Sequence, residues 1–235
     1  RPARPGGGSL EAEDPPWLDS ALSRDPPDRR DRLALARELA ARGAKLALCA
    51  RSADKLEIAR QELEGTGAEV ITMPVDLTDH DEVKTMIDDV VRKYGTIDVL
   101  INNAGILQVG PQENMSIEDY ERAVKTNFWG PLYAIHAVLP YFKQQRSGRI
   151  VNVTSVGGKI ALPHLLPYSA SEFAAVGLSE NMHAELKREN IHVTTVVPNL
   201  TRAESSRNVT VNGNHEDEDA WFSLSDSSPL SQEAE

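Results

Sequence analysis

Polar residues that could bind a ligand follow four of the predicted strands, at the point where each strand ends. Each of them is also a good turn residue, so any one of these ends taken alone could serve only to reverse the chain. Four in succession favour one ligand site, because the carboxyl ends of parallel strands meet at a single edge of a sheet. The residues are Asp76, Asn102-Asn103-Ala104-Gly105, Thr154-Ser155 and Pro198-Asn199.

The elements that must position these residues alternate between apolar strands and amphipathic helices. Gly43 is a natural end for the first helix, and Asp79 and Ser116 are good N-caps for two others. Continuous apolar strands separated by helices predict a doubly wound α/β fold with a parallel sheet. Strands are expected at 45–50, 69–75, 97–101, 149–153 and 191–197, and helices at 33–42, 53–63, 79–94, 116–145 and 168–188.

Composition excludes several classes of function. The 235 residues carry a formal net charge of −11, which disfavours nucleic acid and anionic membranes as partners. We find no run of about 18 apolar residues that could span a membrane, and the first ten residues lack the apolar region of a secretory signal. Cys49 is the only cysteine, and the histidines lack ligand spacing, so we expect no metal site. These features predict a soluble, cytoplasmic protein.

The chain divides into three unequal parts. Residues 1–32 are rich in proline, arginine and glycine and poor in apolar residues, which predicts disorder. Their bias is also typical of GC-rich DNA translated in the wrong frame, so the segment is either disordered or non-ancestral. Residues 33–198 hold nearly all of the periodic pattern. Residues 199–235 form a polar, acidic tail.

Four features of residues 33–198 together resemble the short-chain dehydrogenase/reductase family. They are the run from Asn102 to Gly105, Asn127 in the long helix, Ser155, and Tyr168 thirteen residues later. The stretch from Val193 to Trp221 also resembles a bacterial subgroup of this family. The resemblance implies a Rossmann-like fold, a nicotinamide cofactor, and hydride transfer between a carbonyl and an alcohol.

The resemblance gives three of these residues catalytic roles. Tyr168 is the expected proton donor and acceptor, and Ser155 is expected to polarise the substrate oxygen. Asn127 belongs in the family to a kink that holds a water in a proton relay. Pro131, four residues later, lacks the N–H that would bond the Asn127 carbonyl, which predicts such a kink. A kink that serves packing alone is the alternative.

Glu172 occupies the position where the family has a lysine, one helical turn after Tyr168. The lysine lowers the pKa of the tyrosine and holds the nicotinamide ribose. An ionised glutamate inverts the sign of the field, so we expect the pKa of Tyr168 to be raised instead. An ionised carboxylate is also acceptor-only and offers no donor to a ribose hydroxyl.

The cofactor expected from the resemblance is NADP(H). Ala50 stands where an acidic residue would favour NAD, and Arg51 follows it and suits a 2′-phosphate. A solvated surface charge is the alternative for Arg51. By resemblance, Asp76 and Leu77 lie against the adenine. The other expected cofactor-binding residues are Asn103, Ala104, Gly105 and Pro198.

The sequence departs from the family at the phosphate loop and near the C-terminus. The family's TGxxxGIG loop should precede Leu33, but residues 25–32 contain no glycine, and 18–24 make a poor central strand. The first strand of this topology lies in mid-sheet, between the second and fourth, so its loss leaves two inner edges unpaired. Asn199 replaces the glycine expected after Pro198, and no apolar run after Val197 could form a seventh strand. We therefore predict an incomplete sheet, its first and last strands missing or degraded, and only a remnant of the substrate-covering region.

Three interpretations of the function fit these observations. The first is an NADP(H)-dependent oxidoreductase for a small carbonyl or alcohol, with weak or absent activity. The second is a non-catalytic relative, a pseudoenzyme that serves as a binding or interaction module. The third is a defective gene product. By resemblance, a homodimer would form through the helices at 120–142 and 168–188.

Overall fold

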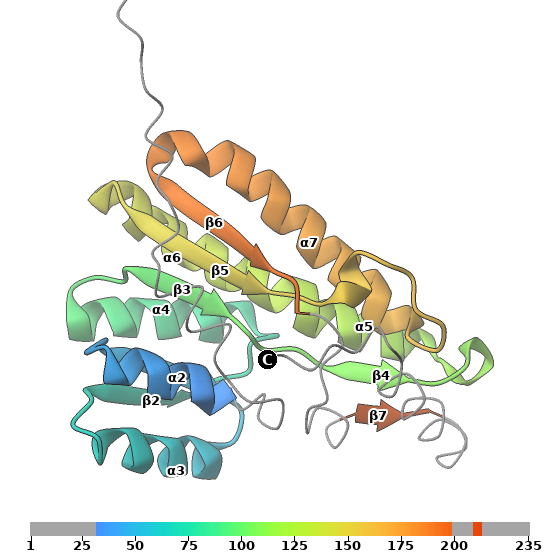
Figure 1. Cartoon of the computed structure of the whole chain (residues 1–235), viewed down its shortest axis with the longest axis horizontal. Helices are drawn as coiled ribbons and strands as arrows, with labels where there is room; N and C mark the ends of the chain where they lie inside the picture. Colours follow the sequence, from blue (N-terminus) through green and yellow to red (C-terminus); the bar gives the residue numbers. More distant parts are fainter. Residues whose placement is uncertain (1–31, 199–208, 213–235) are drawn as a thin grey trace, which may run out of the picture.

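A computed structural model describes residues 32–198 and 209–212 of the chain (Figure 1). The fold is α/β with parallel strands, as the sequence predicts. The elements in chain order are α2 (Arg32–Ala41), β1 (Leu46–Ala50), α3 (Ala53–Glu64), β2 (Val70–Pro74), α4 (His80–Tyr94), β3 (Val99–Asn102), β4 (Leu107–Val109), η1 (Gln112–Asn114), α5 (Ile117–Val124), η2 (Lys125–Trp129), α6 (Gly130–Gln145), β5 (Gly148–Val153), η3 (Val156–Gly158), α7 (Leu166–Leu186), η4 (Lys187–Glu189), β6 (Ile191–Val196) and β7 (Val209–Val211).

Local signals fix the ends of several helices. Gly43 follows α2 with a φ of 80°, a left-handed conformation that glycine adopts without strain. The Asp79 side chain accepts hydrogen bonds from the first backbone N–H groups of α4, and Ser116 forms a capping box with Asp119 at the start of α5. These caps are the ones that the sequence predicts.

The described strands of the central region form two parallel sheets that are not joined to each other. β1 pairs with β2, and β3, β5 and β6 form a separate sheet in the order β3-β5-β6. In Figure 1, β2, α2 and α3 lie together on one side of the molecule, and the β3, β5 and β6 ribbons lie together on the other. Among the described residues, no strand bridges β1 and β3. This break lies where the topology of the family places its first strand.

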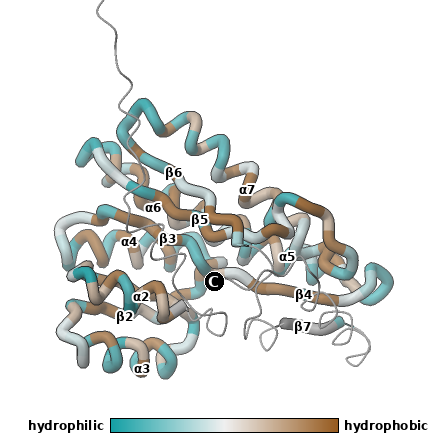
Figure 2. The backbone as a smooth tube through the Cα atoms, viewed as in Figure 1, coloured by the Kyte–Doolittle hydropathy of each residue, from teal (hydrophilic) through white to brown (hydrophobic). Residues whose placement is uncertain are grey.

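One large apolar cluster holds the two sheets together. It contains Ile150 and Ile191 from the larger sheet, and Ile71 and Met73 of β2 pack against it together with helices α4 and α6. A second, smaller cluster, which includes Leu46, joins the opposite face of the β1–β2 sheet to α2 and α3. Figure 2 shows apolar stretches on β4 and β5 and helices of mixed hydropathy. Helices therefore cover both faces of the β1–β2 sheet, as a doubly wound fold requires.

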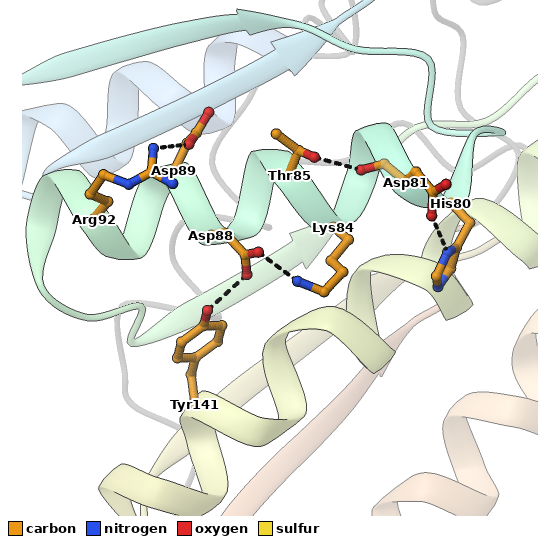
Figure 3. A network of polar contacts seen from close by, with 8 residues as sticks. All are labelled: His80, Asp81, Lys84, Thr85, Asp88, Asp89, Arg92 and Tyr141. Carbon is orange, nitrogen blue, oxygen red and sulfur yellow. Dashed lines mark hydrogen bonds and ion pairs between the residues drawn. The ribbon is translucent and has the colours of Figure 1, made fainter.

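A polar network fixes α4 against α6 at the surface (Figure 3). The Tyr141 hydroxyl of α6 donates to Asp88 at 2.7 Å, and Lys84 Nζ donates to the other carboxylate oxygen at 2.6 Å. These two donors hold the pKa of Asp88 below its usual range. Exposed pairs of this kind contribute little to stability, so the apolar packing beneath them dominates this helix contact.

Two features of the fold were predicted from the sequence only in part or not at all. The long helix expected through Gln145 is interrupted by the π-helical turn η2, in which the Gly130 N–H donates to the Lys125 carbonyl. A short strand, β7, occurs in the segment expected to be only a polar tail. It pairs in parallel with β4, with Leu107 opposite Val209, and so does not extend the β3-β5-β6 sheet. The predictions for residues 1–31 and for Asn199 lie outside the described residues.

Candidate active site

Ser155 and Tyr168 both lie close to Gly157. Ser155 follows β5 and begins η3, where its Oγ accepts a hydrogen bond from the Gly157 N–H at 3.1 Å. Tyr168 lies in the first turn of α7. A Cβ atom added at Gly157 would lie 3.1 Å from Tyr168 Cε1 and 3.6 Å from Ser155 Oγ. The fold thus brings the expected proton donor and the expected polarising hydroxyl together, and the lack of a side chain at Gly157 permits this approach.

Asn127 connects the loop after β3 with the start of α7. Its Oδ1 accepts from the Ile106 N–H at 2.9 Å, and its Nδ2 donates to the Ile106 carbonyl at 3.0 Å and to Ser171 Oγ at 2.9 Å. Ser171 Oγ donates in turn to the Tyr168 carbonyl at 2.7 Å. Asn127 lies within η2, so the expected kink takes the form of a π-helical turn that directs this amide toward α7.

Replacing Asn127 by alanine should destabilise the protein markedly. Asn127 is 4% exposed, and the loss of its side chain leaves the N–H and carbonyl of half-buried Ile106 without these partners. We expect a loss of about 2–4 kcal/mol and a fall in Tm of roughly 10 °C, measured by thermal unfolding. Asn181→Ala is the matched control, because Asn181 makes one exposed bond within α7. Equal Tm values for the two variants would contradict the positioning role of Asn127.

Glu172 is buried one helical turn after Tyr168. Its side chain is 6% exposed, and the Ser155 backbone N–H donates a hydrogen bond to its carboxyl group. The second carboxyl oxygen, Oε2, has no hydrogen-bond partner among the described residues. Burial raises the pKa of Glu172 to about 7, and the Ser155 bond opposes this rise. With a pKa of about 7, a large fraction of the Glu172 side chain is a neutral acid at neutral pH, and the effects expected of an ionised carboxylate apply at higher pH.

Arg51 and Asp76 mark the end of the site expected to hold the adenosine half of a nucleotide. Asp76 follows β2, and its Oδ1 accepts from the Thr78 N–H at 2.9 Å and from the Thr78 hydroxyl at 2.8 Å. These bonds lower the pKa of Asp76, and the positive charge of Arg51 adds to the effect. Arg51 is exposed at the end of β1, so its guanidinium is accessible to a ligand. Leu77 follows Asp76 in the chain, and its carbonyl oxygen would lie 3.1 Å from a Cβ atom added at Gly130.

The remaining expected binding residues lie along the same edge. Asn103, Ala104 and Gly105 are half-buried in the loop after β3, and a Cβ at Gly105 would lie 3.4 Å from Asn127 Oδ1. The Pro198 carbonyl after β6 accepts from the Val156 N–H at 3.2 Å, which places it beside the Ser155 turn. The strand ends therefore converge as the sequence predicts.

Several supporting residues were missed by sequence reasoning. A buried chain of hydrogen bonds runs from Asn102 to Asn152 at 2.8 Å, on to Ser179 at 2.9 Å, and then to Thr195 at 2.6 Å. It links three neighbouring strands to α7. Ser171 and Gly157 were also missed, although a small residue three positions after Tyr168 is a signal of close packing on that face of α7.

At one end of the site, the residues present fit the adenosine half of a nicotinamide nucleotide. At the other end, they differ from those of the resembled family. An accessible arginine beside the Asp76 turn suits a phosphorylated adenosine ribose. At the opposite end, the buried group near Tyr168 is the carboxyl of Glu172, with one oxygen unpartnered in the described part of the chain. Within residues 32–198 and 209–212, no group of three His, Cys, Asp or Glu side chains is placed to hold a metal ion.

The chain belongs to the short-chain dehydrogenase/reductase family. The family model for short chain dehydrogenase matches residues 33–213. The chain is 37% identical over 174 residues to 11-beta-hydroxysteroid dehydrogenase 1A of Arabidopsis thaliana, a match that covers 72% of this chain and 49% of that protein. It therefore spans about half the length of that relative. It is an oxidoreductase-family chain whose matched region includes every described site residue.

Solved structures agree with this assignment. A metagenomic short-chain oxidoreductase in complex with NADP is similar with a TM-score of 0.69 and 30% identity, over 73% of this chain and 78% of that one. NAD⁺-bound xylitol dehydrogenase is similar with a TM-score of 0.66 and 30% identity, over 72% and 66%. The Rossmann-like fold is thus confirmed, and structures with either nucleotide occur among the similar proteins. In the described part of the chain, no helix has both the length and the apolar character needed to cross a bilayer.

Proposed function

We propose that this chain is an NADP(H)-linked oxidoreductase by descent, for a small carbonyl or alcohol, whose activity is weak or absent near and above neutral pH. The observation that carries the proposal is the buried carboxyl of Glu172 one turn after Tyr168. When ionised, this group disfavours the loss of a proton from the Tyr168 hydroxyl, because the two negative charges would lie on one face of a helix.

Each residue of the site has its own role in this proposal. Tyr168 exchanges a proton with the substrate oxygen at its hydroxyl, and Ser155 donates a hydrogen bond to that same oxygen. Asn127 positions Tyr168 through Ser171. When bound, the cofactor supplies the hydride chemistry. Asp76, Leu77, the Asn103-Ala104-Gly105 run and Pro198 hold it in the proposal.

NADP(H) is the proposed nucleotide because the charge at the end of β1 is positive. Arg51 is exposed there and suits a 2′-phosphate, whereas Ala50 offers no carboxylate to a ribose diol. The NADP-bound similar structure supports this choice, and the NAD⁺-bound one shows that the fold admits both. A cytoplasmic location and a homodimer through the long helices belong to the same proposal, and Phe173 on α7 is an exposed apolar side chain on one of them.

The proposal predicts little turnover at pH 8. NADPH consumption with a panel of aldehydes and ketones should not exceed that of the Tyr168→Phe variant, because the ionised Glu172 opposes proton transfer at Tyr168. The measurement is the fall in absorbance of NADPH over time. Enzymes typically turn over at about 1–1000 s⁻¹. A rate in that range that disappears in Tyr168→Phe would overturn weak or absent activity while confirming the reaction class.

The non-catalytic alternative is favoured by a different observation. Among the described residues, the facing edges of β1 and β3 have no strand between them. Unpaired strand edges are templates for pairing with another segment. A binding or interaction module built on this edge needs no turnover. In the same assay, a residual rate that depends on Tyr168 would identify an impaired enzyme, whereas the lack of such a rate fits both alternatives.

A further inference from the structure

The carboxyl group of Glu172 contacts the turn that carries Ser155. A Cβ added at Gly158 in η3 would lie 2.8 Å from the Glu172 carbonyl, so η3 packs directly on this part of α7. One carboxyl oxygen accepts the Ser155 N–H, while Oε2 is buried without a partner in the described part of the chain. A buried acceptor left unmatched is unfavourable, so this oxygen requires either a proton or a donor from a ligand.

Among the described residues, no charged side chain stabilises the ionised form of Glu172. Lys159, at the end of η3, forms an ion pair with Glu180, and Asp119 of α5 pairs with Arg122. Within the described part of the chain, the pKa shift of Glu172 has two causes: burial, which raises the pKa, and the Ser155 N–H, which lowers it. None of the other titratable groups on α7 or on the elements packed against this part of it is among the causes of the shift. These groups are Tyr168, His183 and Glu185 on α7, Glu118, Tyr120 and Glu121 on α5, Lys125 in η2 and His192 on β6.

We propose that Glu172 is a positioning residue that works as a neutral carboxylic acid, in which Oε2–H donates a hydrogen bond to a nicotinamide-ribose hydroxyl while the other oxygen keeps the Ser155 N–H. A protonated carboxyl has both the donor and the acceptor that this arrangement needs, and an ionised one lacks the donor. The inference rests on the proposed NADP(H) site. It replaces the ammonium of the family with a donor that is present only when the group is protonated.

The expected signature is cofactor affinity that weakens as pH rises. If the nucleotide binds only the protonated form and the pKa is about 7, the Kd for NADP⁺ rises about tenfold between pH 6 and pH 8. Calorimetry with NADP⁺ measures this. Adenosine 2′-monophosphate serves as the control ligand, because it shares the titrating 2′-phosphate, has no other group that titrates between pH 6 and pH 8, and has no nicotinamide ribose. The dependence attributed to Glu172 is the part that NADP⁺ shows and this ligand does not.

Two variants separate this role from a structural one. Glu172→Gln keeps an acceptor and a donor at all pH values, so its NADP⁺ affinity should stay within about twofold of the unaltered chain's value at pH 6, with no additional dependence. Glu185→Gln removes an exposed carboxyl from the same helix and should keep the full pH dependence. In the chain without nucleotide, an NMR titration of carbon-13-labelled glutamate should show one carboxyl with a pKa of about 7 that is absent from Glu172→Gln.

The outcomes are distinguishable. Identical, parallel pH profiles for NADP⁺ in the unaltered chain and in Glu172→Gln would overturn the role of Glu172 while leaving the NADP(H) site intact. NADP⁺ affinity in the unaltered chain that changes between pH 6 and pH 8 by the same factor as the affinity of the control ligand would overturn it as well. Failure of every variant, Glu172→Lys included, to bind either ligand at pH 6 would overturn the proposed NADP(H) site itself.

Discussion

Replacing residues 1–31 by an apolar β-strand followed by a glycine-rich loop should raise the Tm by roughly 10 °C. β1 and β3 have no described strand between them, and a parallel strand inserted there gains hydrogen bonds along both of its edges. Each bond contributes about 1 kcal/mol net, and the entropy of ordering the strand offsets part of the sum, so about 3–5 kcal/mol is expected. For a chain of this size that corresponds to a shift on the order of 10 °C.

Thermal unfolding followed by circular dichroism measures this effect. The matched control carries the same graft with proline at the centre of the new strand, which removes a ladder hydrogen bond and disfavours a central strand. We expect the control to melt close to the unaltered chain. An unchanged Tm for the intact graft would show that the two edges are already satisfied, and the account of an incomplete sheet would then be wrong.

Glu172→Lys, made in the grafted chain, should increase NADPH turnover on the order of a hundredfold over the graft alone. A cation one turn from Tyr168 favours ionisation of its hydroxyl, where the carboxylate opposes it, and an opposite charge at this range shifts a pKa by roughly 1–3 units. The same substitution removes the acceptor of the Ser155 N–H, so stability should fall by about 1–3 kcal/mol. Activity and stability should therefore move in opposite directions.

The control for this substitution is Glu185→Lys, which makes the same charge change on an exposed position of α7. It should leave turnover unchanged within about twofold, because an exposed charge is screened by solvent. NADPH consumption and thermal unfolding are measured on both variants. Equal turnover in the two, with Glu172→Lys still folded, would mean that the sign of the charge beside Tyr168 does not limit the reaction.

The parts of the fold that the sequence predicts well depend on local signals. Asp79 and Ser116 cap helices through bonds to residues two or three positions away, and Gly43 ends α2 through its own φ. The strands of the larger sheet are rich in apolar residues, among them Ile150, Val151 and Val193. By contrast, β4 and β7 are three-residue strands that exist because they pair with each other across about a hundred positions. No local pattern in either segment reveals that pairing.

The chemistry of the site shows the same limit. The spacing of Tyr168 and Glu172 predicts correctly that both lie on α7 one turn apart, since it follows from helix geometry. Burial of Glu172 under η3 is a tertiary property, and it is what raises the pKa of this carboxyl to about 7. The sequence indicates what an ionised Glu172 would do, but it does not reveal this burial. The π-helical turn at Asn127 was likewise visible only as a proline-induced kink.

The central claim is that two features together weaken the nucleotide site. They are the gap between β1 and β3 in the described sheets and Glu172, one helical turn after Tyr168. The most direct test of this claim is calorimetric titration of NADPH at pH 8 into the unaltered chain and into the chain grafted with the strand and glycine-rich loop. We predict a Kd weaker than about 100 μM for the unaltered chain, and binding at least on the order of a hundredfold tighter for the graft, because the loop adds backbone N–H donors for the phosphates. Low-micromolar binding by the unaltered chain would contradict the claim.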